Sequence, residues 1–258
     1  MTYGGAVLAK ERRRQLLDEI VHVGRVVTSD FAARHGVSDM TVRTDLEYLE
    51  RQGRVSRTHG GAVPADVAPP IDEFEIRLGV HREAKQRIAA AAVRLITSDE
   101  AVILDSGTTV HHLAQAITGV SALTVYTPAL LAAQHLMRTD GVDVHLLGGR
   151  VIPNWLQTVG TARQLGIKDL IADTLFLGTQ GVDDDLDIVE PVHELVATKQ
   201  RLIRRARRVV LLVDSSKWSR RGGIKVRNLT QIDIVITDAQ PPPKVRDHAA
   251  ATVQFIVA

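Results

Sequence analysis

The chain has 258 residues, which suits one small and one larger domain, and its 45% of hydrophobic and 24% of charged residues exclude a wholly disordered protein. The formal net charge of +2 is too small to identify a nucleic-acid-binding protein by itself. The sequence has no cysteine, which excludes disulfides and thiolate metal sites and is typical of proteins of a reducing cytoplasm.

The start of the chain and its hydrophobic runs carry no targeting signal. Residues 1–10 lack a long apolar run followed by a cleavage site, so we expect no signal peptide. No stretch approaches the roughly 20 apolar residues that a membrane helix needs. We therefore expect a cytoplasmic protein without a membrane partner.

The first part of the chain is predicted to form helices with an arginine-rich surface. Leu16 and Ile20 recur at helical spacing and predict a first helix. Thr28 or Ser29 suits the N-cap of a short second helix, and Gly36 supplies the turn that ends it.

A third helix is predicted from Asp39 to about Arg51, with Ser38 as its cap. Residues 54–58 follow as one strand of a small wing, which residues 59–61 close. Three prolines between 64 and 70 then block helix formation and mark a linker. We therefore predict a first domain over 8–63, a linker over 64–73 and a second domain over 74–258.

In the second domain, short β-rich apolar runs alternate with helical patterns. The predicted strands are 101–104, 123–126, 142–147, 174–177, 209–213, 232–237 and 252–257. The predicted helices are 81–96, 108–117, 129–138, 156–165 and 193–205. This alternation predicts an α/β domain with a mostly parallel sheet that helices cover on both faces.

A second helix, a glycine-containing turn and a polar third helix are the parts of a helix-turn-helix. On the third helix, Arg43 offers a guanidinium to guanine or phosphate, and Thr41 and Thr44 suit phosphates or thymine methyls. The predicted DNA-binding residues are Thr28, Ser38, Asp39, Met40, Thr41, Arg43, Thr44, Arg54, Arg57 and His59. From the pattern alone, a small helical bundle with a solvated charged face is the alternative.

The segment Asp105-Ser106-Gly107-Thr108-Thr109 follows a predicted strand and precedes a predicted helix. Its hydroxyls and the N–H groups at the helix start suit a phosphate or another anion. An ordinary capped turn between strand and helix is the alternative interpretation of this segment.

Polar or glycine-containing segments also follow four of the other predicted strands, 123–126, 142–147, 174–177 and 209–213, where ligands bind in open α/β sheets. The further candidates for effector binding are Thr127, Gly148, Gly149, Gln180, Gly181 and Lys217. Taken singly, each glycine also fits an ordinary turn, and Lys217 also fits a lysine on the surface.

Three other features favour no additional site. His111 and His112 are adjacent, so on a helix they point about 100° apart and do not form a paired-ligand face. The acidic segment 183–187 lacks the glycine and the terminal glutamate of an EF-hand loop. The basic cluster within 199–208 suits contact with DNA or an anionic ligand, but it fits a solvated helix face better, because Leu202, Ile203 and Ala206 supply an inward stripe. We therefore expect no metal and no cofactor.

Two segments of the first domain resemble a known family. Residues 37–46, VSDMTVRTDL, and 57–62, RTHGGA, resemble the N-terminal signature of DeoR-family repressors. The resemblance implies a winged helix-turn-helix. The family usually has two successive arginines where this chain has Arg43 and Thr44.

The second domain resembles the same family in the order of its motifs. Asp105–Thr109, Leu147–Gly149, Lys199 and Asp214–Lys217 fall in family order. The resemblance implies a Rossmann-like α/β effector domain related to ribose-5-phosphate isomerase, and it adds Lys199 to the effector-binding residues. The family commonly has asparagine where this chain has Pro128.

The sequence therefore predicts a transcriptional repressor of carbohydrate metabolism genes that a phosphorylated sugar or related metabolite controls. Its expected partners are a double-stranded DNA operator, the phosphorylated effector and further copies of the chain in a dimer or tetramer, with nucleoid association when it is bound to DNA. One alternative is a sugar-phosphate isomerase with Asp183, Glu194 or Lys199 as acid and base groups. Another is a DNA-architectural protein without a ligand.

Overall fold

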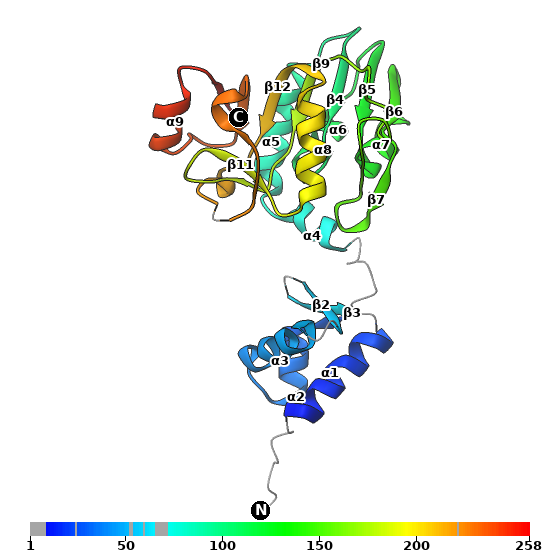
Figure 1. Ribbon diagram of the computed structural model, residues 1–258, viewed down its shortest axis with the longest axis vertical. Coiled ribbons are helices and arrows are strands. Elements are labelled where there is room, and N and C mark those ends of the chain that lie inside the picture. The colour runs from blue at the N-terminus through cyan, green and yellow to red at the C-terminus, as the bar shows by residue number, and fades with distance from the viewer. Residues whose placement is uncertain (1–8, 24, 52–53, 59, 65–71, 221) are drawn as a thin grey trace, which may run out of the picture. The chain divides into compact units, whose positions relative to one another are not determined.

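The structure, a computed structural model, describes residues 9–23, 25–51, 54–58, 60–64, 72–220 and 222–258. The contacts between residues divide the chain into two compact units, Met1–Glu73 and Phe74–Ala258. Figure 1 shows a helical first unit and a second unit built around a large sheet. Within the described ranges, no helix has both the length and the hydrophobicity that crossing a membrane requires.

The first unit is a winged helix-turn-helix. Its elements are α1 (Ala9–Val23), β1 (Val26–Val27), α2 (Thr28–His35), α3 (Asp39–Arg51), β2 (Val55–Thr58) and β3 (Gly61–Pro64). Gly36 joins α2 to α3 with a φ of 64°, a conformation that glycine adopts without strain. The strands pair antiparallel in the order β1-β3-β2. The second and third helices are therefore confirmed. The predicted N-cap of the second helix is wrong, because Thr28 is already the first residue of α2 and the capping position is Val27, which has no side-chain cap hydrogen bond.

One hydrophobic cluster holds the first unit together. Leu16 and Ile20 of α1 are fully buried with Phe31 of α2 and with Val42 and Leu46 of α3. On α3 the buried residues fall on one side of the helix, so the opposite side is left for solvent or a partner.

A parallel sheet of seven strands forms the centre of the second unit. In chain order the strands are β4 (Ala101–Leu104), β5 (Leu123–Thr127), β6 (Val142–Leu146), β9 (Ala172–Leu177), β12 (Ala206–Leu212), β14 (Ile234–Thr237) and β15 (Gln254–Val257). Their spatial order is β15-β14-β12-β9-β4-β5-β6, and all neighbours are parallel. The strand order therefore reverses between β4 and β9, and ligands bind at such a switch point in open α/β sheets.

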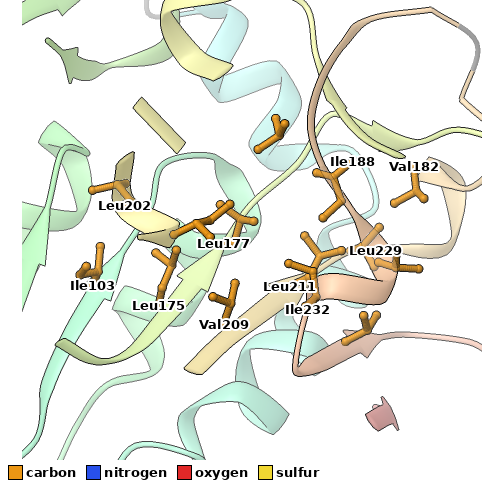
Figure 2. Packing of buried hydrophobic residues seen from close by; sticks show 14 of the residues in the cluster. Ile103, Leu175, Leu177, Val182, Ile188, Leu202, Val209, Leu211, Leu229 and Ile232 are labelled. Atoms are coloured by element: carbon orange, nitrogen blue, oxygen red, sulfur yellow. The ribbon is translucent and has the colours of Figure 1, made fainter. Parts of the chain in front are cut away.

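Helices cover both faces of this sheet, as the alternating pattern predicted. They are α5 (Arg82–Val93), α6 (Thr108–Ala116), α7 (Leu130–Leu136), α8 (His193–Ile203) and α9 (Pro243–Ala249), and the short helix α4 (Asp72–Gly79) precedes them in the chain. Leu175 and Leu177 of β9 pack with Leu202 of α8 in the cluster of Figure 2, whereas Phe176 between them packs with α5 and α6 on the other face. Apolar residues on both faces make the strands continuous hydrophobic runs.

The prediction of a helix over 156–165 is wrong. The chain forms β7 (Arg150–Ile152), a single helical turn η1 (Pro153–Trp155) and β8 (Gln157–Val159), with β7 and β8 paired antiparallel. Leu156 adopts a φ of 48°, which ends the helical turn and returns the chain along β7. Since β8 is buried at all three positions, its sequence carries no alternation that separates a strand from a helix.

A small antiparallel sheet was not predicted. It contains β10 (Gly181–Val182), β11 (Asp187–Glu190) and β13 (Ile224–Asn228), in the order β10-β11-β13. The single turns η2 (Ser215–Lys217) and η3 (Leu229–Gln231) flank β13 in the chain. The small sheet lies between β9 and β14 in the chain, so it is an excursion from the parallel sheet.

Candidate functional site

The start of α3 presents a polar face to solvent. Ser38 caps the helix, because its Oγ accepts a hydrogen bond from the Thr41 backbone N–H at 3.2 Å. Met40 is 71% exposed, and the side chains of Asp39 and Arg43 are exposed beside it. No described residue forms an ion pair or a hydrogen bond with the Arg43 guanidinium, so this cation is available to a partner.

Two arginines of α1 are used inside the first unit. The carboxylate of Asp45 is buried and accepts Arg12 Nε at 2.5 Å and Arg13 Nε at 2.7 Å. The guanidinium of Arg13 also lies 3.9 Å from the ring centre of Tyr48. These contacts fix α3 against α1, so part of the arginine-rich sequence positions the polar face of α3.

The wing is attached to the same helix. Arg57 on β2 pairs with Glu47 on α3 at 2.8 Å, and Glu50 accepts the Arg57 backbone N–H at 3.1 Å. The guanidinium of Arg57 is therefore partly neutralised before any phosphate approaches, whereas the exposed Arg54 has no side-chain partner among the described residues.

The other predicted DNA-binding residues differ in accessibility. Ser38 and Thr44 are exposed, and the Thr44 hydroxyl donates to the Met40 carbonyl at 2.9 Å. The Thr28 side chain is only 4% exposed, which does not favour direct contact with DNA. His59 lies outside the described residues. The assignment of these residues to DNA contacts stays a prediction.

In the second unit, Asp105 lies at the switch point between β4 and β9. Its Oδ2 accepts the Gly178 backbone N–H at 3.0 Å and the ammonium of Lys199 on α8. The Lys199 Nζ also donates to the Gly178 carbonyl at 3.0 Å and lies 3.4 Å from Glu190. These contacts join the carboxyl ends of two central strands to one helix and one strand of the small sheet.

This buried network places one ammonium group, that of Lys199, between the carboxyl groups of Asp105 and Glu190. Burial opposes the charge of Lys199, but Asp105 and Glu190 outweigh it and raise its pKa. Burial also raises the pKa of Glu190, against the attraction of Lys199. Lys199 therefore stays a cation but neutralises internal carboxylates first, which limits what it can offer to a ligand.

Buried polar atoms without partners lie at the start of α6. Gly107 is the N-cap with a φ of 109°, and Ser106, Thr108 and Thr109 are all buried. Among the described groups, neither the Thr109 hydroxyl nor Asp105 Oδ1 has a hydrogen-bond partner. An orphaned buried polar atom requires an explanation, and a bound ligand or water supplies one.

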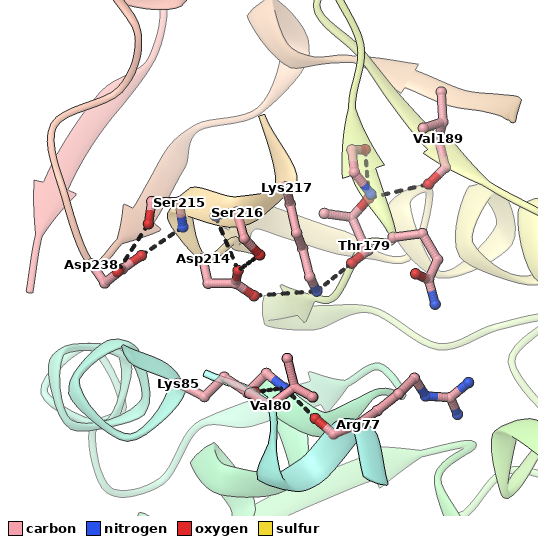
Figure 3. Close-up of polar contacts among 12 residues, drawn as sticks. Arg77, Val80, Lys85, Thr179, Val189, Asp214, Ser215, Ser216, Lys217 and Asp238 are labelled. Carbon is pink, nitrogen blue, oxygen red and sulfur yellow. Dashed lines mark hydrogen bonds and ion pairs between the residues drawn. The ribbon is translucent and has the colours of Figure 1, made fainter. Parts of the chain in front are cut away.

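Lys217 follows β12 at the same edge of the sheet. Its Nζ donates to the Thr179 carbonyl at 2.7 Å and lies 3.7 Å from Asp214, as Figure 3 shows. Burial lowers the pKa of Lys217 against the attraction of Asp214. The loop is fixed from the next strand, because Asp238 accepts the Ser215 backbone N–H at 2.6 Å.

Lys85 is a buried lysine that the predicted site omitted. Its Nζ donates to the carbonyls of Arg77 and Val80, the latter at 2.6 Å. Burial and the nearby charge of Lys217 lower its pKa to about 8. The burial of Lys85 could have been predicted from the sequence, because Lys85 precedes Ile88 by three residues and so falls in the apolar stripe of α5.

Several predicted effector residues have structural partners of their own. The Thr127 hydroxyl accepts the Ala129 backbone N–H at 3.1 Å. A Cβ atom on Gly148 would lie 2.6 Å from the Gln164 carbonyl, so this glycine allows close backbone packing. Gly149 likewise adopts a φ of 110° beside β8. These contacts account for all three residues without a ligand.

Gln180 and Gly181 connect the loop after β9 to the small sheet. The Gln180 backbone N–H donates to Glu190 at 3.2 Å, and the Gly181 N–H donates to the Thr179 hydroxyl at 3.0 Å. The loop after β9 is thus bonded to Glu190, Lys217 and, through Gly178, Asp105. These contacts bring five predicted residues of the effector site together: Asp105, Gln180, Gly181, Lys199 and Lys217.

The three residues of the isomerase alternative have separate partners. Asp183 accepts the backbone N–H groups of Asp185 and Asp187 in its own turn, and the exposed Glu194 pairs with Arg150 at 3.1 Å.

In the described ranges no group of three or more His, Asp or Glu side chains could hold a metal ion. Burial lowers the pKa of His111 to about 4, so this histidine is neutral at pH 7.

Comparisons with known proteins follow the division of the chain. The family described as a DeoR-like helix-turn-helix domain matches residues 12–67, and the DeoR C terminal sensor domain matches residues 80–239. A putative aga operon transcriptional repressor of Escherichia coli O157:H7 is 30% identical over 90% of this chain and 87% of its own. The glycerol-3-phosphate regulon repressor of E. coli K12 is 30% identical over 91% and 93%.

Solved structures are more distant. A D-ribose-5-phosphate isomerase in complex with phospho-erythronic acid is 17% identical, covers 53% of this chain and 54% of its own, and has a TM-score of 0.40. The sorbitol operon regulator SorC of Klebsiella pneumoniae is 10% identical, covers 79% and 89%, and has a TM-score of 0.35.

Proposed function

Because the chain belongs to the DeoR family of transcriptional regulators, we propose that it represses carbohydrate metabolism genes and that a phosphorylated sugar or related metabolite controls its binding to DNA. The observation that carries the proposal is the match of a DNA-binding and a sensor family to successive parts of one chain. The named relatives are a putative aga operon transcriptional repressor and the glycerol-3-phosphate regulon repressor.

In this proposal the exposed start of α3 reads the operator. Arg43 donates to guanine or phosphate, and Met40 contacts thymine methyl groups. Arg54 adds a contact to the DNA backbone from the wing, and Arg57 adds a weaker one because Glu47 already holds its guanidinium. Phosphate contacts of this kind set the register of the protein on DNA without reading its sequence.

The effector is proposed to bind at the carboxyl ends of β4, β9 and β12. The start of α6 offers N–H groups and the unpartnered Thr109 hydroxyl, which suit an anion. Lys217 and Lys85 add positive charge, whereas Lys199 and Asp105 hold the loops in place. A phosphate and several hydroxyls therefore match the donors and acceptors of this edge.

The protein is proposed to act as a dimer or tetramer in the cytoplasm and on the nucleoid. One helix-turn-helix reads a short site, so two copies would read half-sites about 34 Å apart or a multiple of it. The proposal assigns no catalytic step to the sensor domain, since Asp183 and Glu194 hold other partners.

The experiment begins with an operator selected from random DNA by the purified chain. Phosphorylated sugars are then screened by thermal shift, because a ligand that binds the folded state raises the Tm. We expect at least one hit to weaken operator binding in a fluorescence anisotropy titration. Absence of sequence-specific DNA binding, or turnover of a hit in an isomerase assay, would contradict the proposal.

A further inference from the structure

A groove of about 380 Å³ lies between α8 and the small sheet. The residues at the end of α8 that line it are Gln200, Ile203 and Arg204, and those of β13 are Lys225, Val226 and Arg227. We call it the basic groove. Its volume is within the range of sites for small molecules, which begins at about 300 Å³.

Two of the three cations in the basic groove lack partners. Lys225 pairs with Asp187 at 2.8 Å. Arg204 and Arg227 form no side-chain ion pair or hydrogen bond with any residue that the structure describes. Arg204 follows the last turn of α8, where the helix dipole stabilises a cation even without a ligand. Arg227 lies on β13, so no helix dipole stabilises its charge.

The basic groove is separate from the proposed effector site. Arg204 comes just before β12, and Gln231, which also lines the groove, comes just before β14. The groove therefore lies toward the amino ends of these strands, whereas Lys217 and Asp105 follow the carboxyl ends of β12 and β4. The two places are connected by α8, since Gln200 is next in the chain to Lys199.

The lining defines the chemistry of a ligand. Guanidinium groups bind phosphate or carboxylate through paired N–H donors, and two unpartnered groups suit two anionic groups. Gln200 uses its Nε2 to donate to the Val226 carbonyl at 3.1 Å, which leaves its Oε1 as an acceptor. The lining includes no aromatic ring on which a nucleobase could stack.

We propose that the basic groove is a second ligand site of this protein, which binds a compact polyanion carrying two or more phosphate or carboxylate groups. Arg204 and Arg227 bind the anionic groups, and the Gln200 amide oxygen accepts from a hydroxyl or a protonated oxygen. The proposal does not depend on the function proposed for the effector site, because it uses none of the same side chains.

The test is calorimetric titration of the full chain with inorganic pyrophosphate at constant ionic strength. The variant Arg204→Gln/Arg227→Gln should bind pyrophosphate in the basic groove at least tenfold more weakly. The control Arg207→Gln/Arg246→Gln removes the same charge from two exposed arginines that pair with Asp173 and Asp247. It should bind like the original chain, and all variants should keep the same Tm within 2 °C or so.

Lys217→Ala separates the two sites, because it changes only the effector site. The proposal requires that this variant keep a pyrophosphate-binding event that the Arg204→Gln/Arg227→Gln change then removes. Absence of binding at millimolar pyrophosphate would overturn the proposal. So would equal weakening in the control variant, or binding that only Lys217→Ala abolishes.

Discussion

Each unit of the chain contains a buried aspartate paired with basic side chains, but the two carboxylates differ in how completely they are bonded. Asp45 of the DNA-binding unit uses both oxygens, one for Arg12 and one for Arg13. Asp105 of the sensor unit uses Oδ2 for Gly178 and Lys199 and leaves Oδ1 without a partner in the described part of the chain. The first network is structural, whereas the second leaves an acceptor at the place proposed for a ligand.

The comparison predicts the largest stability effect at Lys199. Lys199→Met would leave Asp105 and Glu190 buried without a cation, and removal of one partner from a buried ion pair costs about 3–5 kcal/mol. Urea denaturation of the sensor unit should show this loss. A cost below about 1 kcal/mol would mean that the buried network does not hold the strands together.

A smaller loss is expected in the DNA-binding unit. Asp45→Asn removes the charge that holds Arg12 and Arg13, but both arginine side chains are partly exposed and can turn to solvent. We expect about 1–3 kcal/mol from the lost charge-assisted hydrogen bonds. The unfolding transition of the first unit measures this loss of stability. An unchanged transition would mean that the pairing of Asp45 with the two arginines does not stabilise the unit.

On the DNA side, Arg43→Ala should weaken operator binding by about 1–3 kcal/mol. Arg57→Ala should weaken binding less, because Glu47 and Glu50 already share the charge of Arg57. Since Arg57 is assigned to a phosphate, the loss should be equal across DNA sequences and should make the affinity less dependent on salt. Anisotropy titrations at several salt concentrations separate the two. Equal affinity in both variants and the original chain would show that the wrong face was assigned.

Thr109→Val tests the orphaned hydroxyl directly. The change replaces an unpartnered buried hydroxyl by a methyl group of similar shape, so the stability without ligand should stay equal or rise slightly. Effector affinity should fall by about 1 kcal/mol when measured by calorimetry. A large loss of stability would instead mean that the hydroxyl has a structural partner.

The smallest expected effect is the pH dependence of effector binding. Lys85 has a pKa of about 8, below the ordinary 10.5, so it is protonated at pH 7 and loses its charge as the pH rises through 8. Affinity for an anionic effector should therefore be lower at pH 9 than at pH 7. Lys85→Met should reduce the difference in effector affinity between pH 7 and pH 9. If the variant keeps the pH profile of the original chain, Lys85 does not belong to the site.

Local sequence was sufficient for much of the fold. The apolar stripes of α2 and α3, the Ser38 cap of α3 and the hydrophobic runs of β4 and β9 lie within short windows, where periodicity is informative. The region 156–165 was not predictable in this way, because β8 is buried on both faces and its pairing with β7 depends on the turn at Leu156.

For the candidate effector site, the sequence indicated which edge of the sheet carries the residues, but not the contacts between them. Strand ends with polar loops indicated one edge of the sheet, and Asp105 and Lys217 both lie there. The pairing of Asp105 with Lys199 joins positions 94 residues apart, so only the strand order brings them together. For the same reason Glu190 was missed, since its strand belongs to a small sheet whose pairing is not local.

The central claim is that sensing and DNA reading use different side chains in different units. Lys217→Ala tests it most directly, through one titration with the effector by calorimetry and one with the operator by fluorescence anisotropy. We predict effector binding at least tenfold weaker, with operator affinity in the absence of effector within twofold of the original chain. Unchanged effector affinity, or operator binding lost in a folded variant without effector, would contradict the account.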